Sequence, residues 1–192
     1  MSAITTTPAN TVHLLSYEEA LELPEDKLSE IVNGEVRALP PPVNRHFLLI
    51  EQLATQLRDQ LDRKAFLVVT SAFGQGVRRR PVLTYRVPDI GIYRREDLKA
   101  DDRMVWEEPQ LLVECLSPSN RKGNVSALMR DYAEAGAPEV WLIYPEDRKI
   151  VRWNFVERFH DDIIGGTLAP FRFPEAHVPL QALWDAWDGV LR

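Results

Sequence analysis

The sequence predicts a single domain of the α/β (α+β) class, in which helices flank a mixed central β-sheet. Three observations predict this class. Strand-like runs surround Asn33 and Gly34, an amphipathic helical pattern covers residues 44–63, and short apolar runs alternate with a further helical segment after residue 65. Strands and helices mixed in this way are typical of α/β and α+β architectures.

The N-terminal part begins with residues 1–15, which are expected to be a flexible segment because the first twelve are rich in Thr, Ala and Ser. Ser16 and Glu19 form a capping-box pattern, which predicts a short helix over residues 17–23. Residues 28–39 predict a hairpin, because Asn-Gly suits two turn positions that both need positive φ.

The rest of the chain alternates between the two periodicities. In residues 44–63 the apolar side chains recur at helical spacing, which predicts a helix with one buried stripe. Strands are expected at residues 66–70, 82–86, 88–93, 111–116, 139–144 and 149–155. Residues 94–110 are expected to form a surface loop or short helix, and residues 124–135 and 179–187 to form helices. No linker interrupts this order, so residues 16–192 are expected to form one domain.

Composition limits the classes of function. The net charge of −6 argues against wholesale nonspecific binding to nucleic acid, although a local basic groove is compatible with it. The single cysteine, Cys115, has apolar neighbours and suits a reducing compartment as a buried thiol. No apolar run approaches the ~20 residues of a membrane span, and no signal-peptide pattern is present. These features predict a cytoplasmic protein without membrane contact.

Two acidic residues, Asp89 and Glu114, each interrupt a short apolar strand. A charge in a core strand is costly unless it is paired or bound to a cation. If the two strands are neighbours and the two acids share a face, their carboxylates would repel each other, and a divalent metal would relieve that repulsion. The alternative is that one or both carboxylates point to solvent at a strand end. The strand pattern alone leaves both interpretations open.

Gly91 and a third acid, Glu30, are further candidates for the site of Asp89 and Glu114. Gly91 is expected to leave open space beside Asp89 for a ligand. Glu30 shares a strand face with Leu28 and Val32, so it is either a functional exception on an apolar face or an ordinary charge on an edge strand.

The basic residues and histidines give weaker signals. Lys122, with Arg121, follows Glu114 in a loop where it could meet a phosphate, although a solvated charge pair is the commoner explanation. His46 begins the long helix, where it either contacts a substrate or simply lies near the helix end.

The order of several short motifs resembles the Uma2 family, which belongs to the PD-(D/E)XK, restriction-endonuclease-like superfamily. The motifs are EIVNGE at residues 30–35, His46 ahead of a long helix, VPDI at 87–90, LVECLSPS at 112–119 and YAEAGAPEVWLI at 132–143. The resemblance covers roughly residues 16–156. It implies a restriction-endonuclease-like fold with the acids at its centre.

The resemblance also implies a function, which is a Mg²⁺- or Mn²⁺-dependent endonuclease that hydrolyses phosphodiester bonds in DNA. Asp89 and Glu114 would match the two metal-binding acids, and Glu30 would match the acid contributed by the N-terminal part. The metal would activate a water, and a lysine would orient it. Cutting both strands of a duplex would need two sites, which a twofold homodimer would supply.

The chain departs from the family pattern in the basic half of the site. Leu116 and Leu128 stand where a lysine is expected, and Asn124 replaces an acid. Lys122 is the candidate catalytic substitute, with Arg121 and Arg130 as alternatives. A second hypothesis is therefore a catalytically degenerate nuclease-fold protein that binds nucleic acid or a partner protein. A third is a structural or interaction domain without a site.

Overall fold

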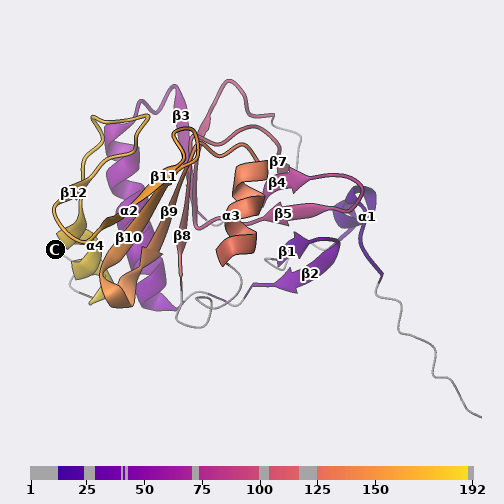
Figure 1. Ribbon diagram of the computed structural model, residues 1–192, viewed down its shortest axis with the longest axis horizontal. Helices are drawn as coiled ribbons and strands as arrows, with labels where there is room; N and C mark the ends of the chain where they lie inside the picture. Colours follow the sequence, from indigo (N-terminus) through magenta and orange to yellow (C-terminus); the bar gives the residue numbers. More distant parts are fainter. Residues whose placement is uncertain are drawn as a thin grey trace, which may run out of the picture.

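The computed structural model describes residues 13–23, 29–39, 41, 43–70, 74–99, 104–116 and 125–189. Two larger β-sheets lie side by side with one helix, α3 (Val125–Glu134), between them (Figure 1). The larger sheet is mixed and has helices on both faces, which confirms the predicted fold class.

The central sheet has six strands. In spatial order they are β11 (Phe159–Ile163), β10 (Lys149–Asn154), β9 (Glu139–Tyr144), β8 (Leu111–Cys115), β6 (Ile90–Arg94) and β3 (Phe66–Thr70). β8 and β9 run parallel, and the other neighbours run antiparallel. β8 and β9 are covered on both faces, which explains why they appear in the sequence as nearly continuous apolar runs.

Two apolar cores hold the helices to this sheet. On one face, α2 (Asn44–Gln60) and α4 (Leu180–Trp187) pack against Ile90, Val113 and Trp141. On the other face, α3 packs its Leu128, Met129 and Tyr132 against residues that include Leu112 and Val140. The predicted helix over residues 44–63 therefore exists and ends at Gln60.

The second sheet has five strands and carries the N-terminal hairpin. In spatial order they are β2 (Glu35–Ala38), β1 (Ser29–Val32), β5 (Thr84–Arg86), β4 (Gly74–Arg78) and β7 (Met104–Val105). Asn33 (φ 52°) and Gly34 (φ 81°) form the turn between β1 and β2, as the Asn-Gly pair predicts. Helix α1 (Tyr17–Leu21) begins with the expected capping box, in which Ser16 Oγ accepts from Glu19 N at 3.1 Å.

Several elements differ from the sequence-based prediction. The expectation of a loop or short helix over residues 94–110 was wrong in its middle, where β7 pairs in parallel with β4 and is buried. β4 was not predicted, and neither was β11, nor the two-stranded pair β12 (Thr167–Leu168) and β13 (Val178–Pro179). Between the predicted strands over residues 139–144 and 149–155 the chain forms a 3₁₀ helix, η2 (Pro145–Asp147).

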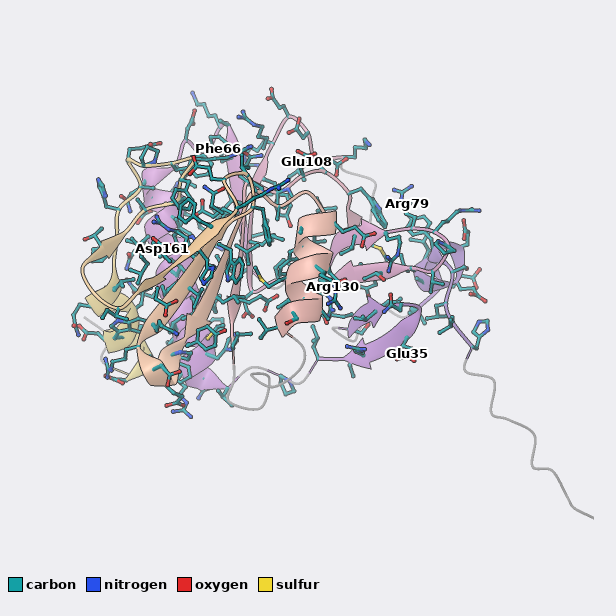
Figure 2. All side chains as sticks on the ribbon, viewed as in Figure 1. Glu35, Phe66, Arg79, Glu108, Arg130 and Asp161 are labelled. Carbon is teal, nitrogen blue, oxygen red and sulfur yellow. The ribbon has the colours of Figure 1, made fainter. Side chains whose placement is uncertain are left out.

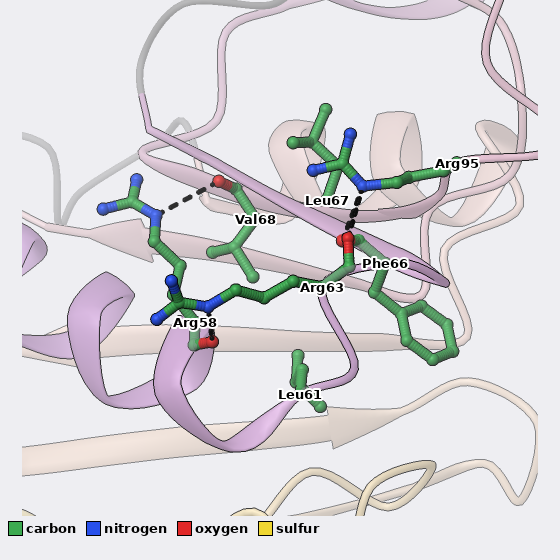
Figure 3. Close-up of a pocket in the computed structure, with 7 residues that line it drawn as sticks. All are labelled: Arg58, Leu61, Arg63, Phe66, Leu67, Val68 and Arg95. Atoms are coloured by element: carbon green, nitrogen blue, oxygen red, sulfur yellow. Dashed lines mark hydrogen bonds between the residues drawn. The ribbon is translucent and has the colours of Figure 1, made fainter.

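The free edge of β3 is capped by arginine side chains (Figure 3). Arg58 Nε donates to Val68 O at 3.3 Å, and Arg95 Nε donates to Phe66 O at 3.2 Å. The arginines line a pocket of about 150 Å³. Charged side chains that cover the backbone of an edge strand discourage pairing with another chain. The pocket lies by the C-terminal end of α2, whereas His46 lies in its first turn.

No helix in the described ranges combines the length and the apolar character needed to cross a bilayer.

Candidate functional site

Asp89 directly precedes β6, and Glu114 lies on the neighbouring strand β8. β6 and β8 pair antiparallel with Ile90 opposite Val113, and extending that register by one residue places Asp89 opposite Glu114. Directly opposite residues in an antiparallel pair project from the same face of the sheet. The side chains of Ile90 and Val113 enter the core on the α2 side, so Glu114, which follows Val113, faces α3.

The Asp89 carboxylate is fixed by two hydrogen bonds. Its Oδ2 accepts from Cys115 N at 2.7 Å, and its Oδ1 lies 2.9 Å from His46 Nε2. Burial by itself would lower the pKa of His46, but the hydrogen bond to Asp89 and the charge of Asp89 outweigh it and raise that pKa. His46 therefore contacts an acid of the site, and its place at the head of the long helix was the signal in the sequence.

The Glu114 carboxyl is fixed from the opposite side by helix α3, because Tyr132 Oη donates a hydrogen bond to Glu114 Oε1. Burial and then the charge of Asp89 raise the pKa of Glu114 well above its usual value, and the Tyr132 hydrogen bond opposes this. The pKa of Tyr132 is also raised well above its usual value, by burial and then by the charge of Glu114. Repulsion between Asp89 and Glu114 is therefore only partly relieved by the protein itself.

Glu30 belongs to the same group of acids. Its strand β1 lies between β2 and β5, so the interpretation as an edge-strand charge was wrong. The residue is 9% exposed. Its Oε2 accepts from Arg86 Nη1 at 2.9 Å, and its Oε1 accepts from Val87 N at 3.1 Å. The charge of Glu30 also contributes to the raised pKa of Glu114.

Arg86 and Asp131 are residues of the candidate site that the sequence analysis missed. Arg86 is 4% exposed and donates from Nε and Nη2 to Asp131 Oδ2, at 2.8 and 2.5 Å. The two residues are 45 positions apart, so no local spacing links them. The available signal was the position of Arg86 at the end of a strand, three residues before Asp89.

The expectation of open space beside Gly91 was wrong. A Cβ atom at Gly91 would lie 2.5 Å from Tyr93 Cε2, so the ring of Tyr93 fills that space. The Tyr93 hydroxyl donates to Gln75 Oε1 at 3.0 Å. Gly91 is needed for packing of this ring and does not make room for a ligand.

The positions where a lysine was expected are part of the core. Leu116 and Leu128 are 3% and 8% exposed and pack in the cluster between the central sheet and α3. Arg130 lies on α3 with its side chain exposed (Figure 2). Lys122, Arg121 and Asn124 fall outside the described residues. Arg86 is a cation whose charge acts on Glu114.

The donor set suits Mg²⁺ better than a transition metal. Within the described ranges, no three His, Cys, Asp or Glu side chains are grouped so that they could hold a metal ion. Mg²⁺ needs fewer protein ligands, because it usually keeps several waters and is held by one or two carboxylates together with substrate phosphate. Asp89 and Glu114 supply two such carboxylates, whose repulsion the protein relieves only in part.

Comparisons with known proteins identify the family and the fold. The model of the Uma2 family, described as "Putative restriction endonuclease", matches residues 16–162. A crystal structure of "a putative nuclease belonging to DUF820" from Anabaena variabilis is similar in fold, with a TM-score of 0.73 and 17% sequence identity. The similarity covers 90% of this chain and 99% of that one. No curated protein matches the sequence. Since the family model spans most of the chain, including Glu30, Asp89 and Glu114, the protein belongs to the Uma2 family.

Proposed function

We propose that the protein is a Mg²⁺-dependent endonuclease that hydrolyses phosphodiester bonds in DNA. The observation that carries the proposal is the position of Asp89 opposite Glu114 on neighbouring strands. Glu30 adds a third carboxylate to this group, through its charge on Glu114. Family membership supports nuclease chemistry, because the Uma2 model that matches the chain is described as "Putative restriction endonuclease".

Each acid has a role that its contacts support. Asp89 and Glu114 would hold the metal, which when bound polarises the phosphate and lowers the pKa of a water. Cys115 N and His46 hold the Asp89 carboxylate in place, and Tyr132 does the same for Glu114. Ligands held by such partners keep their orientation, and loss of a partner typically weakens metal binding. Glu30 and Lys122 complete the proposed catalytic set, Lys122 as the cation that steadies developing negative charge.

A second candidate function is binding without cleavage. The observation that favours it is that Leu116 and Leu128 are core residues, so neither position presents a cation to the acids. In that case the acids would persist in a protein that binds nucleic acid or a partner protein.

A nuclease assay separates the two functions. Wild-type protein and Asp89→Ala would be incubated with single-stranded and double-stranded DNA in Mg²⁺ or Mn²⁺. Asp162→Ala is the matched control, because Asp162 is exposed on β11 and pairs with Lys149 Nζ at 3.0 Å, away from the acids. We expect metal-dependent cleavage by wild type and Asp162→Ala and none by Asp89→Ala.

Two other results would change the assignment. DNA binding without cleavage, together with no Mn²⁺ binding in calorimetric titration, contradicts the nuclease proposal and favours the second function. Cleavage that survives Asp89→Ala contradicts the assigned site. Light scattering of the same samples tests the proposed homodimer, whose two sites would cut both strands.

A further inference from the structure

We propose that Arg86 is a positioning residue of the active site, which ties together the strand of Glu30, helix α3 and the strand end that leads into Asp89. The inference rests on the proposed metal-dependent function. It goes beyond that function because it identifies the group that positions the metal-binding carboxylates. That group is the buried guanidinium of Arg86, which lies outside the acid motifs.

The first link joins Arg86 to the strand of Glu30. β1 and β5 pair antiparallel with Ile31 opposite Tyr85, so Glu30 and Arg86 are opposite when that register is extended by one residue. Arg86 Nη1 donates to one oxygen of Glu30, and Val87 N donates to the other. Glu30 therefore holds both Arg86 and the backbone two residues before Asp89.

The second link joins Arg86 to helix α3. Nε and Nη2 of Arg86 both donate to Asp131 Oδ2. The next residue, Tyr132, donates its hydroxyl to Glu114. The position of α3, and with it the hydrogen bond that orients Glu114, is thus fixed to the strand end that leads into Asp89.

Burial makes this arrangement sensitive to the loss of the guanidinium. The side chain of Arg86 is 5% exposed, and those of Glu30 and Asp131 are 12% and 16% exposed. Removing one partner of a buried ion pair leaves an uncompensated charge in a region of low dielectric. Without Arg86, Glu30 and Asp131 would face each other with no cation between them. They would separate, and the segments carrying Asp89 and Tyr132 would shift.

The test compares Arg86→Met with Arg152→Met. Arg152 is a matched control because its Nε and Nη2 bind both oxygens of Asp161, at 3.1 and 2.7 Å, on β10 and β11. Its side chain is 17% exposed. Mn²⁺ affinity is measured by calorimetric titration, and thermal unfolding is measured on the same metal-free samples. Both variants should lower Tm, because both lose a partly or fully buried ion pair.

The two variants should differ in metal binding. We expect Arg86→Met to weaken Mn²⁺ binding about 10- to 100-fold, as loss of a group that orients metal ligands typically does. Arg152→Met should bind Mn²⁺ as wild type does. Equal Mn²⁺ affinities for the two variants would overturn the positioning role and leave Arg86 a purely structural ion pair.

Conservative variants decide the case if Arg86→Met does not fold. Arg86→Lys keeps the positive charge, but a lysine ammonium lacks the fixed set of N–H donors with which the guanidinium binds two carboxylates at once. It should bind Mn²⁺ more weakly than wild type, whereas Arg152→Lys should match wild type. Wild type that binds no Mn²⁺ would overturn both the proposed function and this role. Wild-type binding that Arg86→Lys leaves unchanged would overturn the positioning role alone.

Discussion

The Tyr132 hydroxyl donates a hydrogen bond to Glu114 Oε1 and thereby connects helix α3 to the acid at the end of β8. Tyr132 is fully buried, and the hydroxyl lowers the pKa of a carboxyl that burial and Asp89 raise. This hydrogen bond is the only one given to Glu114 by a side chain among the described residues, so its removal tests how the acid is held.

Tyr132→Phe should destabilise the protein and raise the pKa of Glu114 further. Loss of a partner leaves a buried acceptor unsatisfied, which costs about 1–3 kcal/mol. Urea unfolding at neutral pH would measure this cost. Tyr85→Phe is the control, because the Tyr85 hydroxyl makes no hydrogen bond within the described part of the chain. A cost no larger than that of Tyr85→Phe would show that the hydrogen bond contributes little.

Glu114→Gln should stabilise the metal-free protein while abolishing its response to metal. The substitution removes a buried charge that is repelled by Asp89, and Gln still offers an oxygen to Tyr132. The expected gain in the free energy of unfolding is about 1 kcal/mol at pH 8. Mn²⁺ should raise the Tm of wild type and leave the Tm of the variant unchanged. Asp162→Asn serves as the exposed control. Melting temperatures that rise equally in Mn²⁺ for wild type and Glu114→Gln would remove Glu114 from the metal site.

Glu139 should make stability fall as pH rises. Burial raises its pKa to about 7, although Trp141 Nε1 and Phe171 N donate to its two oxygens at 2.6 and 2.8 Å. The folded state then holds a proton that the unfolded state has already released above its ordinary pKa of 4.5. This proton contributes up to about 3 kcal/mol to the free energy of unfolding. The contribution is fully present below pH 4.5 and is lost as the pH rises to about 7.

The measurement is the free energy of unfolding of wild type and Glu139→Gln at several pH values between 4 and 8. Because Glu114 also has a raised pKa, both proteins should lose stability with rising pH. Wild type should lose more free energy of unfolding than Glu139→Gln over this pH range, and the difference is the contribution of Glu139. Parallel pH profiles for the two proteins would contradict the prediction.

The acids of the site could be found in the sequence because each breaks a local pattern. Asp89 and Glu114 interrupt apolar strands, and alternation could place both on the same face only if the two strands are neighbours, as β6 and β8 are. Arg86 and Asp131 break no such pattern, because a charge at a strand end or on a half-exposed helix is ordinary. Their pairing depends on how α3 packs against the second sheet, which local periodicity does not specify.

The same reasoning explains which parts of the fold were missed. β3 and β9 have apolar, β-branched sequences and were predicted at the correct residues. β4 has the sequence Gly-Gln-Gly-Val-Arg, which lacks strand propensity. Gly76 is needed for a tertiary contact, since a Cβ atom there would lie 2.3 Å from the Trp106 ring. That close contact exists only once the second sheet has formed.

Leu128→Lys tests whether only the basic half of the site has been lost. Leu128 packs beside Tyr132 in the cluster that covers the α3 face of the sheet, and Tyr132 binds Glu114. A lysine there would bring an ammonium group toward the acids, where it could offset negative charge that develops on a phosphate. We expect the variant to cleave DNA in Mn²⁺ at least about tenfold faster than wild type, which corresponds to about 1.4 kcal/mol of barrier.

The matched control for that gain is Ala133→Lys, which adds the same charge to α3 at an exposed position. It should leave cleavage at the wild-type rate, because its ammonium group points to solvent. Leu128→Lys also loses apolar burial, so its Tm should fall while its activity rises. A general electrostatic effect on DNA binding would raise cleavage equally in both variants. A folded Leu128→Lys protein with no gain would show that a cation at this position does not complete the site.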